Sequence, residues 1–172
     1  MMKAIIKTIE TISEYTGKSV HWLCIALVLV LTYDTVARYV FNAPPVWAYE
    51  TSWMIGATMA VMGWSYTHRH HGHIRVDVFY TRLSHRGKAI IDVVCSLIFL
   101  FPLLAVLLYS SSSFTMFAWK MNQKLVESSW MPPATPILAL IAVGIYLFTL
   151  QCIAQFMRDV YQLIRGKPYD TT

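Results

Sequence analysis

The chain has 172 residues, of which 56% are hydrophobic and only 13% are charged, and its formal net charge is +5. Soluble domains carry about 25% charged residues, so a water-soluble globule of this size is excluded. The same composition excludes a disordered chain, and three cysteines are too few for a disulfide-stapled fold. The remaining class is an all-α integral membrane protein.

Four apolar stretches are long enough to cross a bilayer, whose hydrocarbon core requires about 20 residues of helix. They cover residues 19–41, 46–67, 89–119 and 132–157. Pro44 and Pro45 separate the first two stretches, and Pro132 and Pro133 open the fourth. Pro102 lies inside the third stretch, where we expect it to kink the helix. We therefore predict a single four-helix membrane domain, whose remaining parts are connections at 68–88 and 120–131 and a tail at 158–172.

The segment before the first stretch is predicted to be an interfacial helix. Over residues 1–18, four isoleucines recur at helical spacing opposite lysines and glutamates, as expected of an amphipathic helix on a membrane surface. A cleaved signal peptide is the rival interpretation, but Asp34 and Arg38 follow the apolar block and no Ala-x-Ala site is present. We therefore treat residues 19–41 as an uncleaved span.

Lysine and arginine are distributed unequally over the predicted connections. All but three of the 14 basic residues lie before the first span, in the 68–88 connection or in the tail. The exceptions are Arg38, Lys120 and Lys124. The positive-inside rule then places both termini in the cytoplasm. The positive charge indicates topology and attraction to anionic membrane lipid, and it is not evidence of nucleic-acid binding.

Charged residues within membrane spans are candidate functional residues. Asp34 and Arg38 are four residues apart, so they share a helix face and can neutralise each other. Either this pair faces a partner subunit or a substrate path, or it reaches from the outer boundary toward lipid headgroups. Glu50 lies about one turn into the second span, near the positive end of the helix dipole. It either binds a cation or an arginine, Arg38 included, or is a plain interfacial acid.

The second span also carries a stripe of small residues. Ala48, Ser52, Gly56 and Ala60 recur every four residues, a pattern that lets another helix approach closely. The spacing does not distinguish a neighbour within the chain from one in another subunit.

The histidines invite a cofactor interpretation. Between residues 68 and 73 there are four histidines, but Asp77 is the only nearby carboxylate, which favours a polar cytoplasmic turn over a metal site. A haem subunit would need two facing imidazoles, and only His21 and His68 lie at comparable predicted depth. No phosphate loop, HExxH motif or nucleophile–base pair is present in the sequence. We therefore expect no metal, no cofactor and no enzymatic activity, and infer an accessory or structural subunit.

Three short motifs follow one another between Arg38 and Tyr80. An Arg-Tyr-x-Phe ends the first span, a tryptophan and an acid open the second, and His-Ile-x-Val-Asp follows it. This ordered set resembles the small membrane subunit of TRAP (tripartite ATP-independent periplasmic) transporters, the DctQ-like family. The matching residues are Arg38, Tyr39 and Phe41, then Trp47 and Glu50, then His73, Ile74, Val76 and Asp77. The chain departs from the family pattern in having a single acid after the tryptophan and extra histidines before His73.

The resemblance implies a subunit of a bacterial inner-membrane importer that runs on sodium rather than ATP. A large permease subunit would hold the substrate and sodium sites, a periplasmic binding protein would deliver an organic acid, and this chain would brace the permease. Arg38, Trp47 and Glu50 would then stabilise the outer end of the first hairpin, while Arg75 and Asp77 would organise the cytoplasmic turn. Two alternatives stay open: a structural or assembly subunit of another membrane complex, redox complexes included, and a self-associating small membrane protein.

Overall fold

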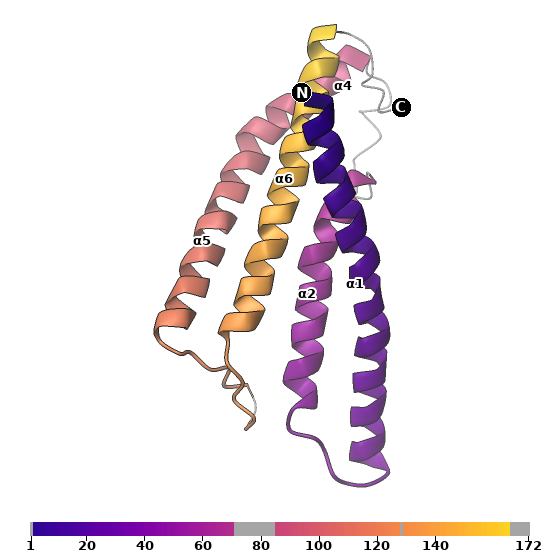
Figure 1. The fold of residues 1–172 in the computed structure, drawn as a ribbon, viewed down its shortest axis with the longest axis vertical. Coiled ribbons are helices and arrows are strands. Elements are labelled where there is room, and N and C mark those ends of the chain that lie inside the picture. Colours follow the sequence, from indigo (N-terminus) through magenta and orange to yellow (C-terminus); the bar gives the residue numbers. More distant parts are fainter. Residues whose placement is uncertain (1, 71–84, 128, 166–172) are drawn as a thin grey trace.

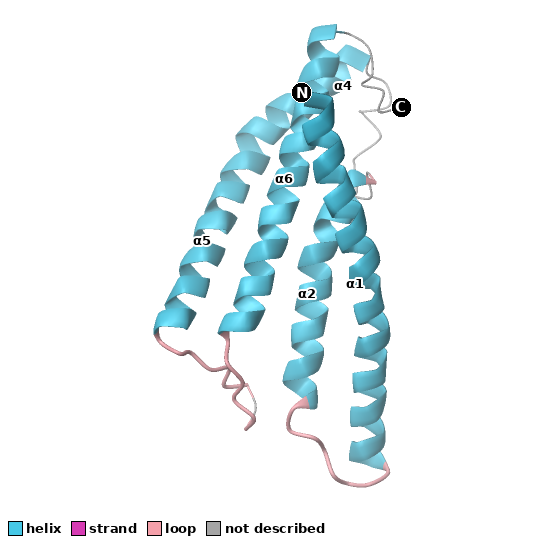
Figure 2. Ribbon diagram, in the orientation of Figure 1, coloured by secondary structure: helices cyan, strands magenta, loops and turns pink. Residues whose placement is uncertain are grey.

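The structure is a computed structural model and describes residues 2–70, 85–127 and 129–165. These residues are helical apart from short connections and one isolated bridge between Lys124 and Pro133 (Figure 2). The helices are α1 (Met2–Tyr39), α2 (Ala48–Arg69), α4 (His85–Cys95), the π-helical turn η1 (Ser96–Leu100), α5 (Phe101–Lys120) and α6 (Thr135–Arg165). The predicted all-α class is confirmed.

The long helices form an open layer, as seen in Figure 1. In the part of the chain that the structure describes, α6 packs against α4 and α5 on one side and α2 on the other, and α2 packs against α1. Helices α1 and α5 are therefore the two edges of the layer. We call the end that holds the N-terminus and the end of α6 the terminal end, and the opposite end, with the loops after α1 and α5, the loop end (Figure 1).

Three helical stretches are long and apolar enough to cross a membrane. They are Ile6–Tyr39, Ile90–Lys120 and Thr135–Ile164, which correspond to three of the four predicted spans. Helix α2 has 22 residues, a length of about 33 Å at the α-helical rise of 1.5 Å per residue. It is long enough for a span, but it does not reach the apolar character of the other three.

Helix α1 continues without a break through the boundary predicted at residue 18. One face of its first half is buried, with Ile6, Ser13 and Val20 no more than 7% exposed. Gly17 lies on this side against the ring of Tyr66 of α2, and a Cβ atom at Gly17 would collide with that ring. The contacts with α2 and α6 therefore extend the helix toward the N-terminus, where the sequence predicted a separate surface helix.

Pro102 is the second residue after the π-helical turn η1. Proline has no backbone N–H, and its ring crowds the carbonyl four residues earlier, here that of Ile98 within η1. A widened turn accommodates this crowding while the helix continues. Leu100 and Phe101 keep right-handed helical dihedrals, so the proline widens the helix at this point without ending it.

Close approach of two backbones joins α2 to α6. A Cβ atom at Gly144 would lie 2.7 Å from Cγ1 of Val61 and 3.2 Å from the backbone nitrogen of Met62. Beyond this contact, the rings of Trp64 and Phe148 meet edge to face with their centroids 5.8 Å apart. Gly144 is therefore needed at the centre of the layer because it has no side chain.

We predict that Gly144→Ala destabilises the isolated chain by about 1–3 kcal/mol, since overpacking forces neighbouring atoms to move. Thermal unfolding in detergent, followed by circular dichroism, would measure the loss. Gly63→Ala is the matched control: a Cβ atom there meets nothing within 4 Å, and alanine favours the helix by up to about 1 kcal/mol. Equal melting temperatures for the two variants would contradict the packing argument.

Candidate functional site

Charged side chains from three helices meet at the terminal end. Glu10 of α1 and Arg158 of α6 form an ion pair, and their side chains are 9% and 17% exposed. Arg69 of α2 donates through Nη1 to the backbone carbonyl of Glu10 at 2.7 Å and to Oε2 of Glu14 at 2.7 Å. With the neighbouring charges these residues make up the terminal-end charge cluster, consisting of Glu10, Glu14, Lys18, Arg69, His70 and Arg158.

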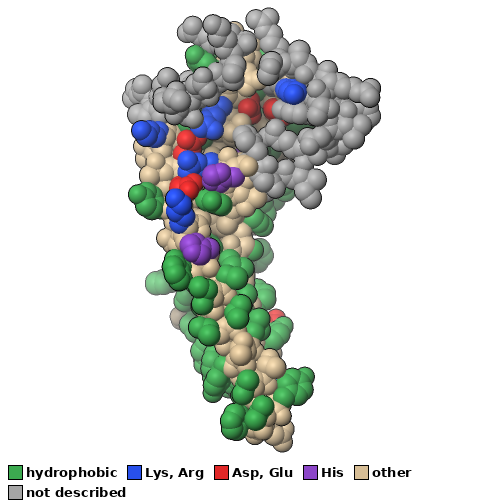
Figure 3. All heavy atoms as spheres, turned by 90° about the vertical axis from the view of Figure 1, so that its right-hand side faces the viewer, with side chains coloured by type: hydrophobic (Ala, Val, Ile, Leu, Met, Phe, Trp, Pro, Cys, Tyr) green, Lys and Arg blue, Asp and Glu red, His purple; other side chains and the backbone are tan. Residues whose placement is uncertain are grey.

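Glu14 is the centre of the outer part of this cluster. Besides Arg69, its carboxylate contacts Nε2 of His70 at 3.2 Å and Nζ of Lys18 at 3.0 Å. Figure 3 shows basic, acidic and histidine side chains gathered near the terminal end of one face, with apolar side chains along the rest. Below the charges, Oγ of Ser13 donates a buried hydrogen bond of 2.9 Å to Oε1 of Gln151.

The terminal-end charge cluster fastens α1 to both α2 and α6. Each buried charge faces an opposite charge, so the attraction offsets part of the cost of removing both from water. The sequence placed Glu10 and Glu14 on the polar face of a surface helix, and so missed these contacts. The sequence did contain a signal for these contacts. Glu10 and Glu14 are four residues apart, and they lie on the same predicted side of the membrane as Arg69 and Arg158.

At the loop end, Asp34 and Arg38 form the pair that their spacing allows. Nη2 of Arg38 lies 3.1 and 3.2 Å from the two carboxylate oxygens of Asp34, and the side chains are 47% and 21% exposed for Arg38 and Asp34. The ring of Trp47 stacks on Tyr33 with centroids 5.7 Å apart. The start of α2 is thereby held against the last turns of α1.

Glu50 faces the loop between α5 and α6. It is only 1% exposed, and with Tyr49, Trp53, Leu125 and Glu127 it lines a cavity of about 180 Å³, which we call the acidic cavity. Arg38 bonds to Asp34 on α1, so the structure does not show the alternative pairing of Arg38 with Glu50 across the hairpin. The cavity instead combines two carboxylates with two aromatic side chains.

The small-residue stripe of α2 divides between two environments. Ala48 is buried, at 2% exposure, whereas Ala60 is exposed. Ser52 is half-buried and donates to the backbone carbonyl of Tyr49 at 2.8 Å. A Cβ atom at Gly56 would meet nothing within 4 Å, so none of the described residues packs closely against the stripe at this position.

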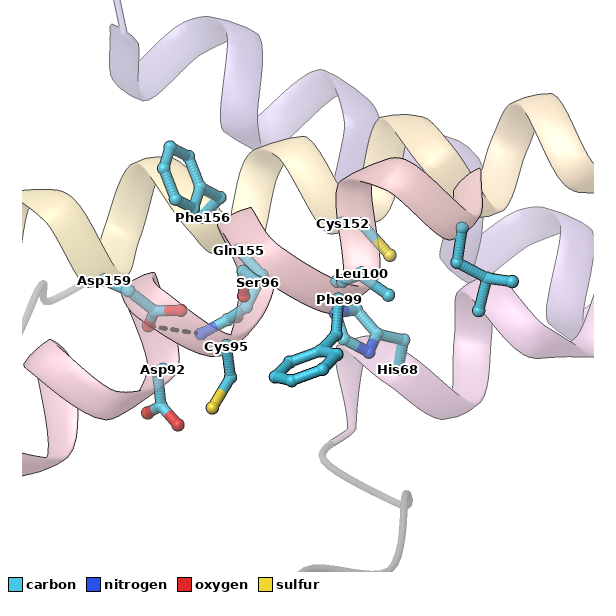
Figure 4. A pocket seen from close by; sticks show the side chains of 11 residues that line it. His68, Asp92, Cys95, Ser96, Phe99, Leu100, Cys152, Gln155, Phe156 and Asp159 are labelled. Atoms are coloured by element: carbon cyan, nitrogen blue, oxygen red, sulfur yellow. Dashed lines mark hydrogen bonds between the residues drawn. The ribbon is translucent and has the colours of Figure 1, made fainter. Parts of the chain in front are cut away.

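A second polar cavity lies at the terminal end, between α2, α4, η1 and α6. It has a volume of about 340 Å³, and its lining includes His68, Asp92 and Asp159. In Figure 4 the two aspartates lie near each other, His68 enters from α2, and Nε2 of Gln155 donates to Oδ1 of Asp159 at 3.0 Å. Two carboxylates and one imidazole from three helices therefore line the same cavity, but within the described residues no three His, Cys, Asp or Glu side chains are grouped closely enough to hold a metal ion.

The other histidine-turn candidates fall outside this site. His73, Arg75 and Asp77 lie outside the described residues. His21, the partner of His68 in the haem hypothesis, is exposed and stacks on Trp22 at 5.3 Å between ring centroids.

Helices of membrane-spanning length, joined at the terminal end by charged contacts between α1, α2 and α6, define a helical membrane protein. A comparison with protein families makes this specific. The model for the DctQ component of tripartite ATP-independent periplasmic transporters matches residues 27–162. The chain therefore belongs to this family, as a multi-pass membrane component of a TRAP transporter and not an enzyme. No curated protein matches the chain in a sequence comparison.

We predict that Glu10→Gln destabilises the chain by about 3–5 kcal/mol, because it removes one partner of a largely buried ion pair. Unfolding in detergent measures the change. Glu127→Gln, which alters an exposed acid at the other end, should stay within about 0.5 kcal/mol of the wild type. The Arg158→Gln variant and the Glu10→Gln/Arg158→Gln double variant complete the comparison. If the stability losses of the two single variants simply add in the double variant, the two side chains are not coupled and the assignment is wrong.

Proposed function

We propose that the chain is the small permease subunit that braces a large permease subunit during sodium-coupled uptake of an organic acid, which a periplasmic binding protein delivers. The match to the DctQ component over residues 27–162 carries this proposal.

A brace must resist deformation, and the contacts of this chain are suited to that task. The terminal-end charge cluster ties α1, α2 and α6 together at one end. At the other end, the stack of Trp47 on Tyr33 joins α2 to α1. Between the ends, Gly144 lets α6 approach the backbone of α2 closely. Because α1 and α2 are held together at both ends and α2 and α6 lie close together between them, sliding of α1 or α2 would break several contacts at once.

In the proposed orientation the terminal end is cytoplasmic and the loop end is periplasmic, with α2 as the fourth span. The structure brings Lys18, Arg69 and Arg158 to the terminal end, and the positive-inside rule assigns such an end to the cytoplasm. The acidic cavity then opens on the periplasmic side, where the binding protein docks. The membrane is the bacterial inner membrane, since a periplasmic component requires that location.

The sequence candidates take roles that follow from these positions. Arg38, Trp47 and Glu50 stabilise the periplasmic end of the first hairpin, and Ser52, Gly56 and Ala60 form a contact surface for a partner. His73, Arg75 and Asp77 organise the cytoplasmic turn, as their motif in the family resemblance implies.

We predict that a mild-detergent pull-down of the tagged chain from its native membranes recovers one much larger multi-span permease in equal amount. Mass spectrometry of each stoichiometric companion is the measurement. Recovery of the chain alone, or together with cofactor-bearing redox subunits, would overturn the proposed function while leaving the helical membrane fold intact.

We predict that Glu50→Gln reduces the yield of the complex or the rate of uptake by about tenfold, equivalent to about 1.4 kcal/mol. The change keeps the size of the side chain but removes a buried charge at the periplasmic end. Membrane insertion should be normal, since it depends on the apolar spans. Lys124→Gln, an exposed charge change at the same end, is the control. Normal complex yield and uptake in Glu50→Gln would remove Glu50 from the functional residues.

A further inference from the structure

A groove of about 530 Å³ runs along α5 toward the loop end, and its described lining residues all belong to this helix. From its first lining residue, Tyr109, to its last, Lys120, the helix advances by about 16 Å at a rise of 1.5 Å per residue. This length is close to half of a hydrocarbon core of about 30 Å, so the groove extends over about one leaflet of a bilayer. We call it the α5 groove, and its residues are Tyr109, Ser112, Ser113, Met116, Phe117 and Lys120.

The groove is hollow because two serines lie between bulkier side chains along α5. The hydroxyl of Ser112 is already used within the protein: it donates to the backbone carbonyl of Leu108 at 2.7 Å and lies 2.9 Å from the hydroxyl of Tyr146 of α6. The surface of the groove is therefore mainly apolar despite its serines. An apolar hollow at membrane depth suits a hydrocarbon chain, because apolar cavities do not hold water.

A cation lies at the loop-end mouth of the α5 groove. Lys120 lines the groove and is exposed. Arg38, at the same end of the molecule, lies against Asp34, whereas Lys120 has no ion pair within the part of the chain that the structure describes. Its neighbour Trp119 is exposed as well, and tryptophans gather at the headgroup level of membranes. The mouth of the groove therefore offers a positive charge at the depth of lipid phosphates.

The order of these features along α5 distinguishes a phospholipid from other occupants. A phosphate at the mouth and an acyl chain directed inward would meet first the lysine and then the apolar hollow. Close packing of a transmembrane helix depends on small residues, whereas the rings of Tyr109 and Phe117 border this groove. A small water-soluble anion would contact the lysine but leave the apolar part unused. An anionic headgroup complements Lys120 best, because it carries no cation of its own to offset the phosphate charge.

We infer that the α5 groove binds one anionic phospholipid of the leaflet at the loop end. Its phosphate lies on the ammonium group of Lys120, and one acyl chain follows the groove past Met116 as far as Tyr109. The inference requires that α5 crosses the membrane, as the apolar run Ile90–Lys120 indicates. It does not depend on the proposed function. The bound lipid covers a hollow on α5, which is an edge of the layer.

The charge contact is tested with the full-length chain, purified in detergent and stripped of lipid. The chain is titrated with phosphatidylglycerol or with phosphatidylcholine, and native mass spectrometry counts the bound lipids. One phosphatidylglycerol should bind at least fivefold more tightly than phosphatidylcholine. Lys120→Gln should weaken phosphatidylglycerol about fivefold, equivalent to about 1 kcal/mol for one basic residue beside anionic lipid, and Lys120→Arg should restore the affinity. Lys124→Gln, an exposed lysine in the following loop, is the matched control and should keep the wild-type affinity.

The position of the acyl chain is tested separately. Phosphatidylglycerol with a photo-reactive group on one acyl chain should form its adduct within residues 109–117. Ser113→Leu fills the hollow and should lower the yield of this adduct at least fivefold. Ala105→Leu is the control, since Ala105 is an exposed residue of α5 outside the groove. Both leucine variants should melt at the wild-type temperature in lipid-free detergent, which shows that a lost adduct does not result from unfolding.

Three results would overturn the inference. The first is an unchanged affinity of Lys120→Gln for phosphatidylglycerol, or adducts spread evenly over the exposed sides of α1 and α5, as expected of lipid that merely surrounds the protein. The second is displacement of phosphatidylglycerol by an equal concentration of inorganic phosphate, which would assign the lysine to a free anion. The third is a photo-crosslinking residue at position 113 that joins the chain to another protein in native membranes, because a protein partner would then cover the groove.

Discussion

The ion pair between Glu10 and Arg158, together with the two bonds from Arg69, is the interaction on which the arrangement of the helices depends. Helix α1 is an edge of an open layer, so it has neighbours on only one side. The cluster gives it contacts with α2 and with α6 at the same place. Because α6 also holds α5, one junction at the terminal end connects both halves of the layer.

Polar contacts can determine how the helices pack because the hydrophobic effect contributes little to helix association inside a membrane. Lipid tails are as apolar as leucine, so burying apolar side chains between helices gains less than it does in water. The layer is held instead by charges at its terminal end, by Ser13 with Gln151 below them, and by the close approach at Gly144.

Much of the helical framework could be predicted from the sequence. The apolar runs and paired prolines located three long apolar helices and the position of α2, and the spacing of Asp34 and Arg38 indicated their pairing. The positions that were missed depend on contacts between distant segments. The spacing of Glu10 and Glu14 fits a helix on the membrane surface as well as a helix packed against others. Only their contacts with Arg69 and Arg158 distinguish the packed helix from the surface helix. Likewise, the direction in which Glu50 faces depends on the fold of the loop near Leu125, which lies 75 residues further along the chain.

The extent of the family match bears on the role of the N-terminal segment. The match begins at residue 27 and so includes Arg69 and Arg158 but not the acids that bind them. Glu14 and Glu10 thus pair with Arg69 and Arg158, two arginines near helix ends that lie within the region matched by the family. Without those acids, two arginines from adjacent helices would lie close together at the terminal end, and their repulsion would act against the α2–α6 contact. Residues 2–26 are therefore an integral part of the frame in this protein, and a version of the chain that lacked them would be expected to open at this end first.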